Sequence, residues 1–260
     1  MADPRPLADA IAGIVREAAG LALARFHTDF ARWEKTGGSP VCEVDLAVDR
    51  LLKDRLSALL PDAGWLSEET ADRPDRLACR RVWVVDPIDG TRDYIRGRPG
   101  WCVSVALIED GHPLIGVLDA PVRGETWHAV AGHGVTRDGA RVHAGTRTAF
   151  PGARVPVDAL PKADRDLVAV QKPNSIALRI AMVADDRADL VATLRWGNEW
   201  DIAAAVLVAA EAGATVSDAL GAPLTFNKPD PRAYGVLVTT PGIHDAAVAH
   251  LAPRARAAIG

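Results

Sequence analysis

The chain has 260 residues, of which 48% are hydrophobic and 25% are charged, and its formal net charge is −4. This composition is typical of a globular protein with a substantial core, and without a basic stripe it argues against a nucleic-acid polymer as partner. No apolar run approaches the about 20 residues that span a membrane, so we expect no membrane association. The start MADPRPLADA lacks a signal-peptide pattern, and the three cysteines show no metal-binding spacing. We therefore expect a cytoplasmic protein with reduced thiols.

The first half of the chain predicts two helices beside a sheet. Apolar residues recur at helical spacing over 7–33, and a second helical face runs up to Pro61. The expected strands are 64–67, 82–85, 101–108, 114–120 and 125–130, the last three as an antiparallel meander.

The second half predicts a further set of helices and strands. Residues 144–166 are rich in Pro, Ala, Arg and Asp, which indicates an irregular connection between two lobes of one domain, roughly 1–145 and 165–260. The expected helices are 175–184, 202–213 and 241–251. The expected strands and loops are 166–170, 189–191, 215–218, 223–228 and 235–239.

The most informative stretch is RVWVVDPIDGTRDY, residues 81–94. An apolar strand ends in two turn signals, so the carboxylates of Asp86 and Asp89 follow it three residues apart. Gly90 permits a close approach to a ligand, and Thr91 can begin a short helix whose first N–H groups attract an anion. Carboxylates beside an anion require a cation, and hard oxygen ligands suit Mg²⁺. An ordinary pair of turns is the alternative for this motif alone.

Other acids lie where helices and strands begin or end. Asp45 and Asp201 fall in the first turns of predicted helices, where the helix dipole alone would favour them. Glu68 and Glu69 follow the strand at 64–67 and could be a plain solvated pair.

Together these segments resemble the motifs of the inositol monophosphatase superfamily of metal-dependent phosphomonoesterases. The matching segments are KTGGSPVCEVD, WLSEET, WVVDPIDGT and EWDIAA, in collinear order over nearly the whole chain. The resemblance implies an enzyme rather than a silent scaffold. It also implies an α/β (α+β) fold, a layered αβαβα sandwich of the inositol monophosphatase / fructose-1,6-bisphosphatase type. Family members are often dimers, so a homodimer is an open alternative, and lithium inhibition is a corollary.

The resemblance further implies a role for each matched residue. Two or three Mg²⁺ ions would be held by Glu68, Asp86, the carbonyl of Ile88, Asp89 and Asp201, with Asp86 as the bridge. Catalysis would involve Asp45 and Thr91 as the pair that activates the water, with Glu69 nearby and Lys35 on a loop over the metals. The N–H groups of Gly90 and Thr91 would hold the phosphate. Cys42 stands where the family usually has threonine, which puts one supporting hydrogen bond in doubt.

The substrate would be a small phosphorylated metabolite. Asp93, EWDIAA and the later FNK resemble the bacterial 3′(2′),5′-bisphosphate nucleotidases of sulfur assimilation, which convert 3′-phosphoadenosine 5′-phosphate to AMP and phosphate. Inositol-1-monophosphatase and histidinol-phosphate phosphatase are the alternatives. The segment NSIALR departs from the Gly-Ser-Ser-x-Lys turn of many nucleotidases, and Arg179 would replace the lysine. The candidate cations for a second phosphate are Lys172, Arg179, Arg195 and Lys228.

Overall fold

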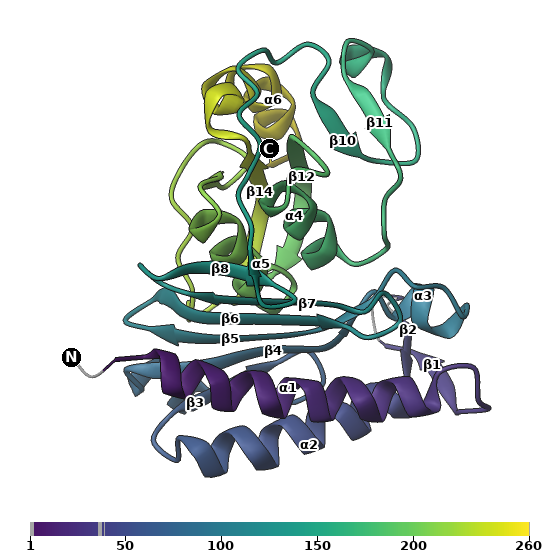
Figure 1. Ribbon diagram of the computed structural model, residues 1–260, viewed down its shortest axis with the longest axis vertical. Helices are drawn as coiled ribbons and strands as arrows, with labels where there is room; N and C mark the ends of the chain where they lie inside the picture. Colours follow the sequence, from purple (N-terminus) through teal and green to yellow (C-terminus); the bar gives the residue numbers. More distant parts are fainter. Residues whose placement is uncertain (1–2, 36–37, 39, 260) are drawn as a thin grey trace.

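The computed structural model describes residues 3–35, 38 and 40–259. Its layers alternate between helices and sheets (Figure 1). In order they are α1 (Arg5–Arg25) with α2 (Glu43–Leu59), a seven-stranded sheet, α4 (Ile176–Ala184) with α5 (Glu199–Glu211), a three-stranded sheet, and α6 (His244–Ile259). This arrangement confirms the predicted αβαβα sandwich.

The large sheet forms the middle of the molecule. Its strands, in spatial order, are β3 (Gly64–Ser67), β4 (Arg81–Asp89), β5 (Cys102–Glu109), β6 (His112–Ala120), β7 (Glu125–Val130), β8 (Gly134–Arg137) and β9 (Ala140–Arg141). Within this sheet, as far as the structure describes the chain, the β3–β4 pair is the only parallel one. Both faces of β4 are buried: Trp83 and Val85 pack toward α1 and α2, whereas Val82 and Val84 pack toward α4 and α5. Burial on both faces explains the uninterrupted apolar run before Asp86.

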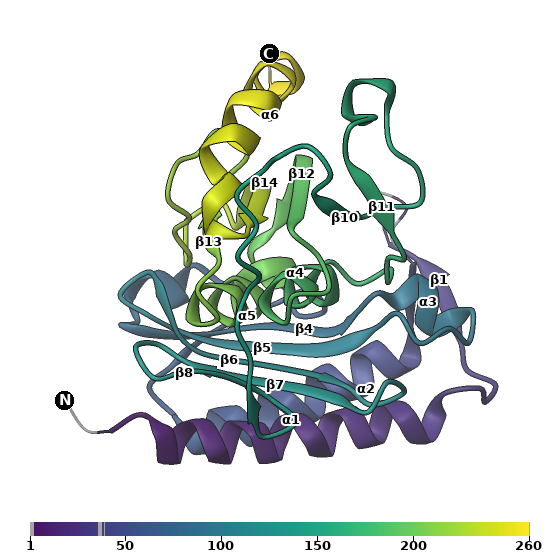
Figure 2. The same cartoon turned by 45° about the horizontal axis from the view of Figure 1, so that its top comes forward.

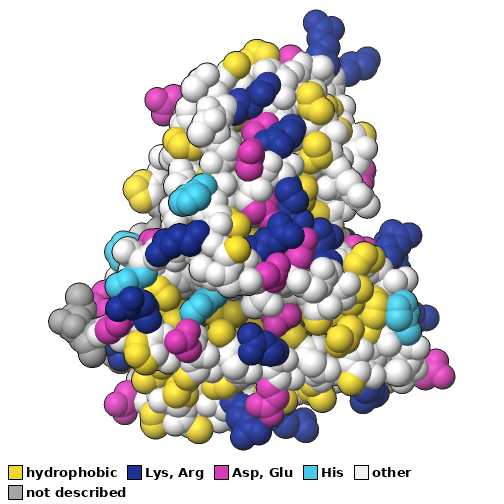
Figure 3. Space-filling model, in the orientation of Figure 1, with side chains coloured by type: hydrophobic (Ala, Val, Ile, Leu, Met, Phe, Trp, Pro, Cys, Tyr) yellow, Lys and Arg dark blue, Asp and Glu magenta, His cyan; other side chains and the backbone are white. Residues whose placement is uncertain are grey.

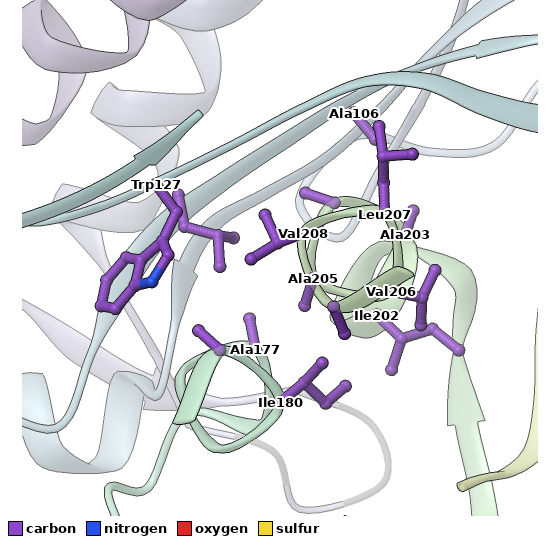
Figure 4. Packing of buried hydrophobic residues seen from close by; sticks show 14 of the residues in the cluster. Ala106, Trp127, Ala177, Ile180, Ile202, Ala203, Ala205, Val206, Leu207 and Val208 are labelled. Atoms are coloured by element: carbon purple, nitrogen blue, oxygen red, sulfur yellow. The ribbon is translucent and has the colours of Figure 1, made fainter. Parts of the chain in front are cut away.

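Helix α5 lies closely against the large sheet because its contact face is rich in alanine. Figure 4 shows Ala203 and Ala205 of α5 among the side chains that fill the layer between the sheet and α4. A Cβ atom added to Gly116 of β6 would lie 2.7 Å from the carbonyl oxygen of Ala204. The glycine therefore sets how near the helix comes, and with it the position of the helix start.

The small sheet covers the other side of α4 and α5 (Figure 2). Its central strand β14 (Arg232–Thr239) is antiparallel to both β12 (Leu190–Asn198) and β13 (Thr215–Ser217). The sequence predicted a strand at 189–191 only, whereas β12 continues to Asn198. A register shift between Thr193 and Trp196 interrupts the two-residue periodicity on which the prediction depends.

Several predicted boundaries were wrong. The first helix ends at Arg25 rather than near residue 33, because Phe26 is extended and His27 has a φ of 67°. Residues 32–34 instead form β1 (Arg32–Glu34), which pairs with β2 (Pro40–Cys42). The connection at 144–166 contains β10 (Arg154–Pro156), parallel to β11 (Val168–Val170).

One further difference lies near the C-terminus. The last helix continues to Ile259 instead of ending near residue 251, whereas residues 223–228, expected among the remaining strands and loops, form a loop. Within the part of the chain that the structure describes, no helix combines the length and the apolar character needed to cross a membrane.

Candidate active site

A cavity of about 450 Å³ opens where the end of β4 meets the α4–α5 layer and the small sheet. Four acids line it, namely Glu68, Asp86, Asp89 and Asp201. Four bases also line it, namely Arg92, Lys172, Arg179 and Arg195. Figure 3 shows acidic and basic side chains close together at the level where the narrow upper part of the molecule joins the broad lower part. The cavity therefore has both a negative and a positive portion.

The end of β4 brings Asp86 and Asp89 into the interior. The ladder to β5 is irregular between these two residues, and Asp86 Oδ1 accepts a hydrogen bond of 3.1 Å from the N–H of Ile88. The turn then requires Gly90, whose φ is 100° and whose added Cβ would lie 2.6 Å from the carbonyl oxygen of Gly100. Helix α3 (Thr91–Ile95) begins directly afterwards. The turn thus buries two carboxylates beside a helix start.

Asp45 and Asp201 occupy equivalent positions in α2 and α5. Each is the third residue of its helix and closes a capping box: Asp45 accepts from the N–H of Cys42, and Asp201 from the N–H of Asn198, both at 2.8 Å. The helix-start interpretation is therefore right for both. Asp45 makes one contact beyond the capping box, because its second oxygen accepts from the Thr91 hydroxyl at 3.2 Å.

Cys42 supplies the hydrogen bond that its difference from threonine put in doubt. Its Sγ atom lies 2.9 Å from Asp45 Oδ2 and donates to it. Burial raises the pKa of the Cys42 thiol to about 12, so the group keeps its proton at neutral pH. The thiol can thus do what a threonine hydroxyl would do here.

The carboxylates of Glu68, Asp86 and Asp201 offer oxygens that all lie within 4.8 Å of one another. Burial is the main cause that raises the pKa of Asp86 well above its usual value, and repulsion from Glu68, Asp89, Asp201 and Asp45 adds to it. Burial likewise raises the pKa of Asp201 to about 7. A divalent cation would remove this repulsion, and hard oxygen donors suit such an ion. The donor set fits a metal site.

Asp89 lines the same cavity but has partners of its own. Its carboxylate accepts from the Ser175 hydroxyl at 2.5 Å and from the N–H of Ala177 at 2.7 Å, at the start of α4. Burial raises the pKa of Asp89 to about 6. Asp89 does not belong to the close group of three acids that the described residues form. Ser175 was missed in the sequence, although a serine before an apolar helical run is a common cap.

Lys35 is the cation nearest to the two glutamates. Its Nζ atom lies 3.0 Å from Glu68 Oε1 and 2.7 Å from Glu69 Oε1. Burial raises the pKa of Glu69 to about 7, and the bond to Lys35 opposes this rise. The rest of the lysine loop, residues 36, 37 and 39, lies outside the described residues.

The cationic portion of the cavity comes mainly from Arg179 of α4 and Arg195 of β12, with Lys172 before α4 and Arg92 of α3 in the same wall. Arg179 donates to the carbonyls of Pro173 and Asn174 at 2.9 and 2.6 Å, so it holds the turn before α4. Burial lowers the pKa of Arg179, and the nearby charge of Arg195 contributes to this. Lys172 forms an ion pair of 2.6 Å with Asp158.

Lys228 does not line the cavity, contrary to its predicted role as a substrate contact. Its ammonium donates to the carbonyl of Arg232 at 2.6 Å and lies 3.6 Å from Glu199. Glu199 is fully buried and accepts from the N–H groups of Asn227 and Lys228 at 2.6 and 3.1 Å. Glu199, the first residue of EWDIAA, therefore holds the FNK loop in place. The EWDIAA glutamate and the FNK lysine are thus explained by structure and give no evidence for a substrate contact.

Asp93 also has a structural partner instead of a place in the cavity wall. It accepts from the N–H of Asn174 at 3.2 Å, and a side chain at Gly100 would collide with it. Asp93 thus holds the loop before α4, whose Asn174 lines the cavity. Trp196, which also lines the cavity with an exposed fraction of 52%, was not predicted at all.

Comparisons with known proteins give matches over most of the chain. The model of the "Inositol monophosphatase family" matches residues 3–257. The 3′(2′),5′-bisphosphate nucleotidase CysQ of Escherichia coli (strain K12) is 36% identical over 202 residues, which cover 74% of this chain and 81% of the relative. The fructose-1,6-bisphosphatase/inositol-1-monophosphatase of Thermotoga maritima is 31% identical and covers 72% and 75%. A solved IMPase structure from Thermotoga maritima superposes with a TM-score of 0.84 at 26% identity, over 98% of this chain and 100% of that one.

Proposed function

Because the chain belongs to the inositol monophosphatase family and is a metal-dependent phosphomonoesterase, we propose that its substrate is 3′-phosphoadenosine 5′-phosphate. The products would be AMP and phosphate. The observation that carries this proposal is the pair of guanidinium groups of Arg179 and Arg195 in the wall of the cavity that also contains the acids. Like charges placed together favour an anion between them, and a bisphosphate offers a second one beyond the phosphate that is cleaved.

The acids form the catalytic half of the proposed site. Glu68, Asp86, Asp89, Asp201 and the carbonyl of Ile88 would hold two or three Mg²⁺ ions, with Asp86 shared between two of them. When bound, such ions neutralise phosphoryl charge and promote ionisation of the attacking water. The first N–H groups of α3, at Gly90 and Thr91, lack partners within the helix and would donate to the phosphate oxygens.

Asp45 and Thr91 would move the proton. The Thr91 hydroxyl lies 3.2 Å from Asp45 Oδ1 and 3.0 Å from the carbonyl oxygen of Ile88. Burial raises the pKa of Asp45 to about 6, which leaves a carboxylate able to accept a proton near neutral pH. Asp45 would take the Thr91 proton while Thr91 takes one from the water, and Glu69 would lie next to this path.

Other members of the family offer alternatives that the charges do not favour equally. Inositol 1-phosphate and histidinol phosphate carry one phosphate, so they would offer no second phosphate to the Arg179–Arg195 pair. Fructose 1,6-bisphosphate would occupy both charged portions, and a Thermotoga maritima relative is named for activity on it. Fructose 1,6-bisphosphate has no purine base, so a contact with the base would distinguish it from 3′-phosphoadenosine 5′-phosphate. We further propose a cytoplasmic enzyme; the homodimer stays an open alternative.

A substrate panel with Mg²⁺ tests the proposal. We expect kcat/KM for 3′-phosphoadenosine 5′-phosphate to exceed that for inositol 1-phosphate and histidinol phosphate by about tenfold or more, as one charge-assisted contact predicts. Fructose 1,6-bisphosphate also carries a second phosphate, so a preference over it would come from the base and not from this contact. A panel in which inositol 1-phosphate is the best substrate would replace the proposal with an inositol monophosphatase.

A further inference from the structure

Strand β12 carries a bulge that presents consecutive residues to the cavity. Its pairing with β14 shifts between Thr193 and Trp196, and Arg195, Trp196 and Gly197 all line the cavity. In a regular strand, neighbouring side chains point to opposite faces, so this arrangement depends on the bulge.

The bulge is well supported by hydrogen bonds. The Thr193 hydroxyl accepts from the N–H of Val236 at 3.0 Å. The Tyr234 hydroxyl lies 2.9 Å from the carbonyl of Ala255 and 3.3 Å from that of Leu194. Two of these contacts, to Thr193 and to the carbonyl of Leu194, thus give side-chain partners to backbone groups where the ladder is irregular.

The indole of Trp196 is held in place although half of it is exposed. Tyr234, its cross-strand neighbour, contacts it edge-on with ring centroids 5.3 Å apart. The Arg232 guanidinium lies 5.1 Å from the centre of the indole, and Asp230 holds that guanidinium through bonds of 2.7 and 3.0 Å. Yet 52% of Trp196 remains exposed. A large aromatic group that is fixed and still exposed in a polar cavity is suited to bind a flat ring.

The cavity that Trp196 lines has a volume of about 450 Å³, which is room for such a ring. Gly197 and Ala233, which pair across the two strands, line the same cavity. Arg195, the cation that we assign to the second phosphate, directly precedes the indole. A base and a phosphate of one nucleotide could therefore contact adjacent residues of one strand.

We propose that Trp196 determines specificity by stacking on the purine base of the substrate. This inference rests on the proposed nucleotidase function and adds the residue that recognises the base. Stacking uses the face of the base rather than its hydrogen-bonding edge, so the identity of the base should matter little. What should matter is whether a base is present.

The experiment compares a substrate that has a base with one that does not. We would measure kcat and KM for the wild type, Trp196→Ala and Trp196→Phe with 3′-phosphoadenosine 5′-phosphate and with methyl riboside 3,5-bisphosphate. For Trp196→Ala we expect KM for the nucleotide to rise about ten- to a hundredfold, with kcat within about twofold and the base-free substrate unaffected. Trp196→Phe retains an aromatic face and should stay within about threefold of the wild type.

Two results would overturn the inference alone. One is equal losses on both substrates in Trp196→Ala, which would indicate that the indole only supports the cavity. The other is no loss on either substrate. Neither result changes the substrate preference of the wild type, which is measured separately. If the wild type prefers the nucleotide over inositol 1-phosphate, the proposed function stands. A wild type that prefers inositol 1-phosphate would instead remove the proposed function, and this inference with it.

Should Trp196→Ala fold poorly, fluorescence keeps the inference testable. With Ca²⁺ in place of Mg²⁺, the difference in indole emission between wild type and Trp196→Phe isolates Trp196. We expect 3′-phosphoadenosine 5′-phosphate to quench this difference signal and methyl riboside 3,5-bisphosphate to leave it unchanged. Equal responses to both ligands, or no response to either, would contradict stacking.

Discussion

The acidic and cationic portions of the cavity are built in different ways. The acids Asp86 and Asp45 are deeply buried and Asp201 is partly buried, at the end of a central strand or in the capping boxes of two helices. The cationic portion depends on a bulged strand and on Arg179, which holds a turn, while Trp196 stays half exposed. In the proposed assignment, the chemistry would depend on the central strand and the helix starts, whereas discrimination between substrates would depend on local features of the small sheet and α4.

Removal of the central acid should have the largest effect. Asp86→Asn deletes the charge that we assign to both ions, so kcat/KM with Mg²⁺ should fall on the order of a thousandfold or more. Steady-state kinetics with a phosphate-release assay would measure it. Asparagine keeps the oxygen that accepts from Ile88, so a loss of fold is not expected. Activity of Asp86→Asn near the wild-type level, or full activity of the wild type in excess chelator, would contradict the metal assignment.

The next largest effect concerns the proton path. Asp45→Asn and Thr91→Ala should each lower kcat about a hundredfold, because the two groups share one hydrogen bond. The double variant should lose little more than either single variant, since residues that act as a unit are not additive. A double loss equal to the product of the two single losses would show that the residues have separate roles.

Specificity should respond to the cationic portion alone. Arg195→Ala should raise KM for 3′-phosphoadenosine 5′-phosphate about ten- to a hundredfold and spare 3′-AMP, which has only the phosphate that is cleaved. Arg256→Ala removes an equal charge from an exposed position on α6 and serves as the control. If Arg195→Ala weakens both substrates alike, the guanidinium does not bind the second phosphate.

The smallest effect concerns stability without metal. The folded protein holds Asp201 and Glu69 with pKa values of about 7, and Asp45 and Asp89 with values of about 6, all above those of the unfolded chain. Between about pH 4 and 7 the folded state therefore binds more protons, and stability in chelator should fall as the pH rises. Thermal unfolding would show this fall, and Mg²⁺ at pH 7.5 should restore the midpoint.

Asp86→Asn is the matched variant for this pH series, since it removes one of the repelling charges. In chelator at pH 7.5 it should unfold about 3 °C or more above the wild type, and with a smaller pH dependence. Identical pH profiles for the two proteins would mean that the buried acids do not control stability.

The two portions also differed in how far the sequence could predict them. Asp86, Asp89 and Gly90 follow an apolar run with turn signals, and the acids of the framework belong to motifs in collinear order. The fold layers were predictable for the same reason. Trp196 was not, because a bulge breaks the periodicity on which strand prediction depends. Lys228 was a candidate because a second phosphate needs a cation, whereas its position follows from a buried glutamate that only the three-dimensional contacts reveal.

The most direct measurement is a crystal structure with Ca²⁺ and 3′-phosphoadenosine 5′-phosphate, in which the cation supports binding without rapid turnover. We predict ions among Glu68, Asp86 and Asp201 that contact the 3′-phosphate, with the 5′-phosphate on the guanidinium of Arg195. Ions at another place, or a nucleotide whose 5′-phosphate points away from Arg179 and Arg195, would contradict this division of the cavity.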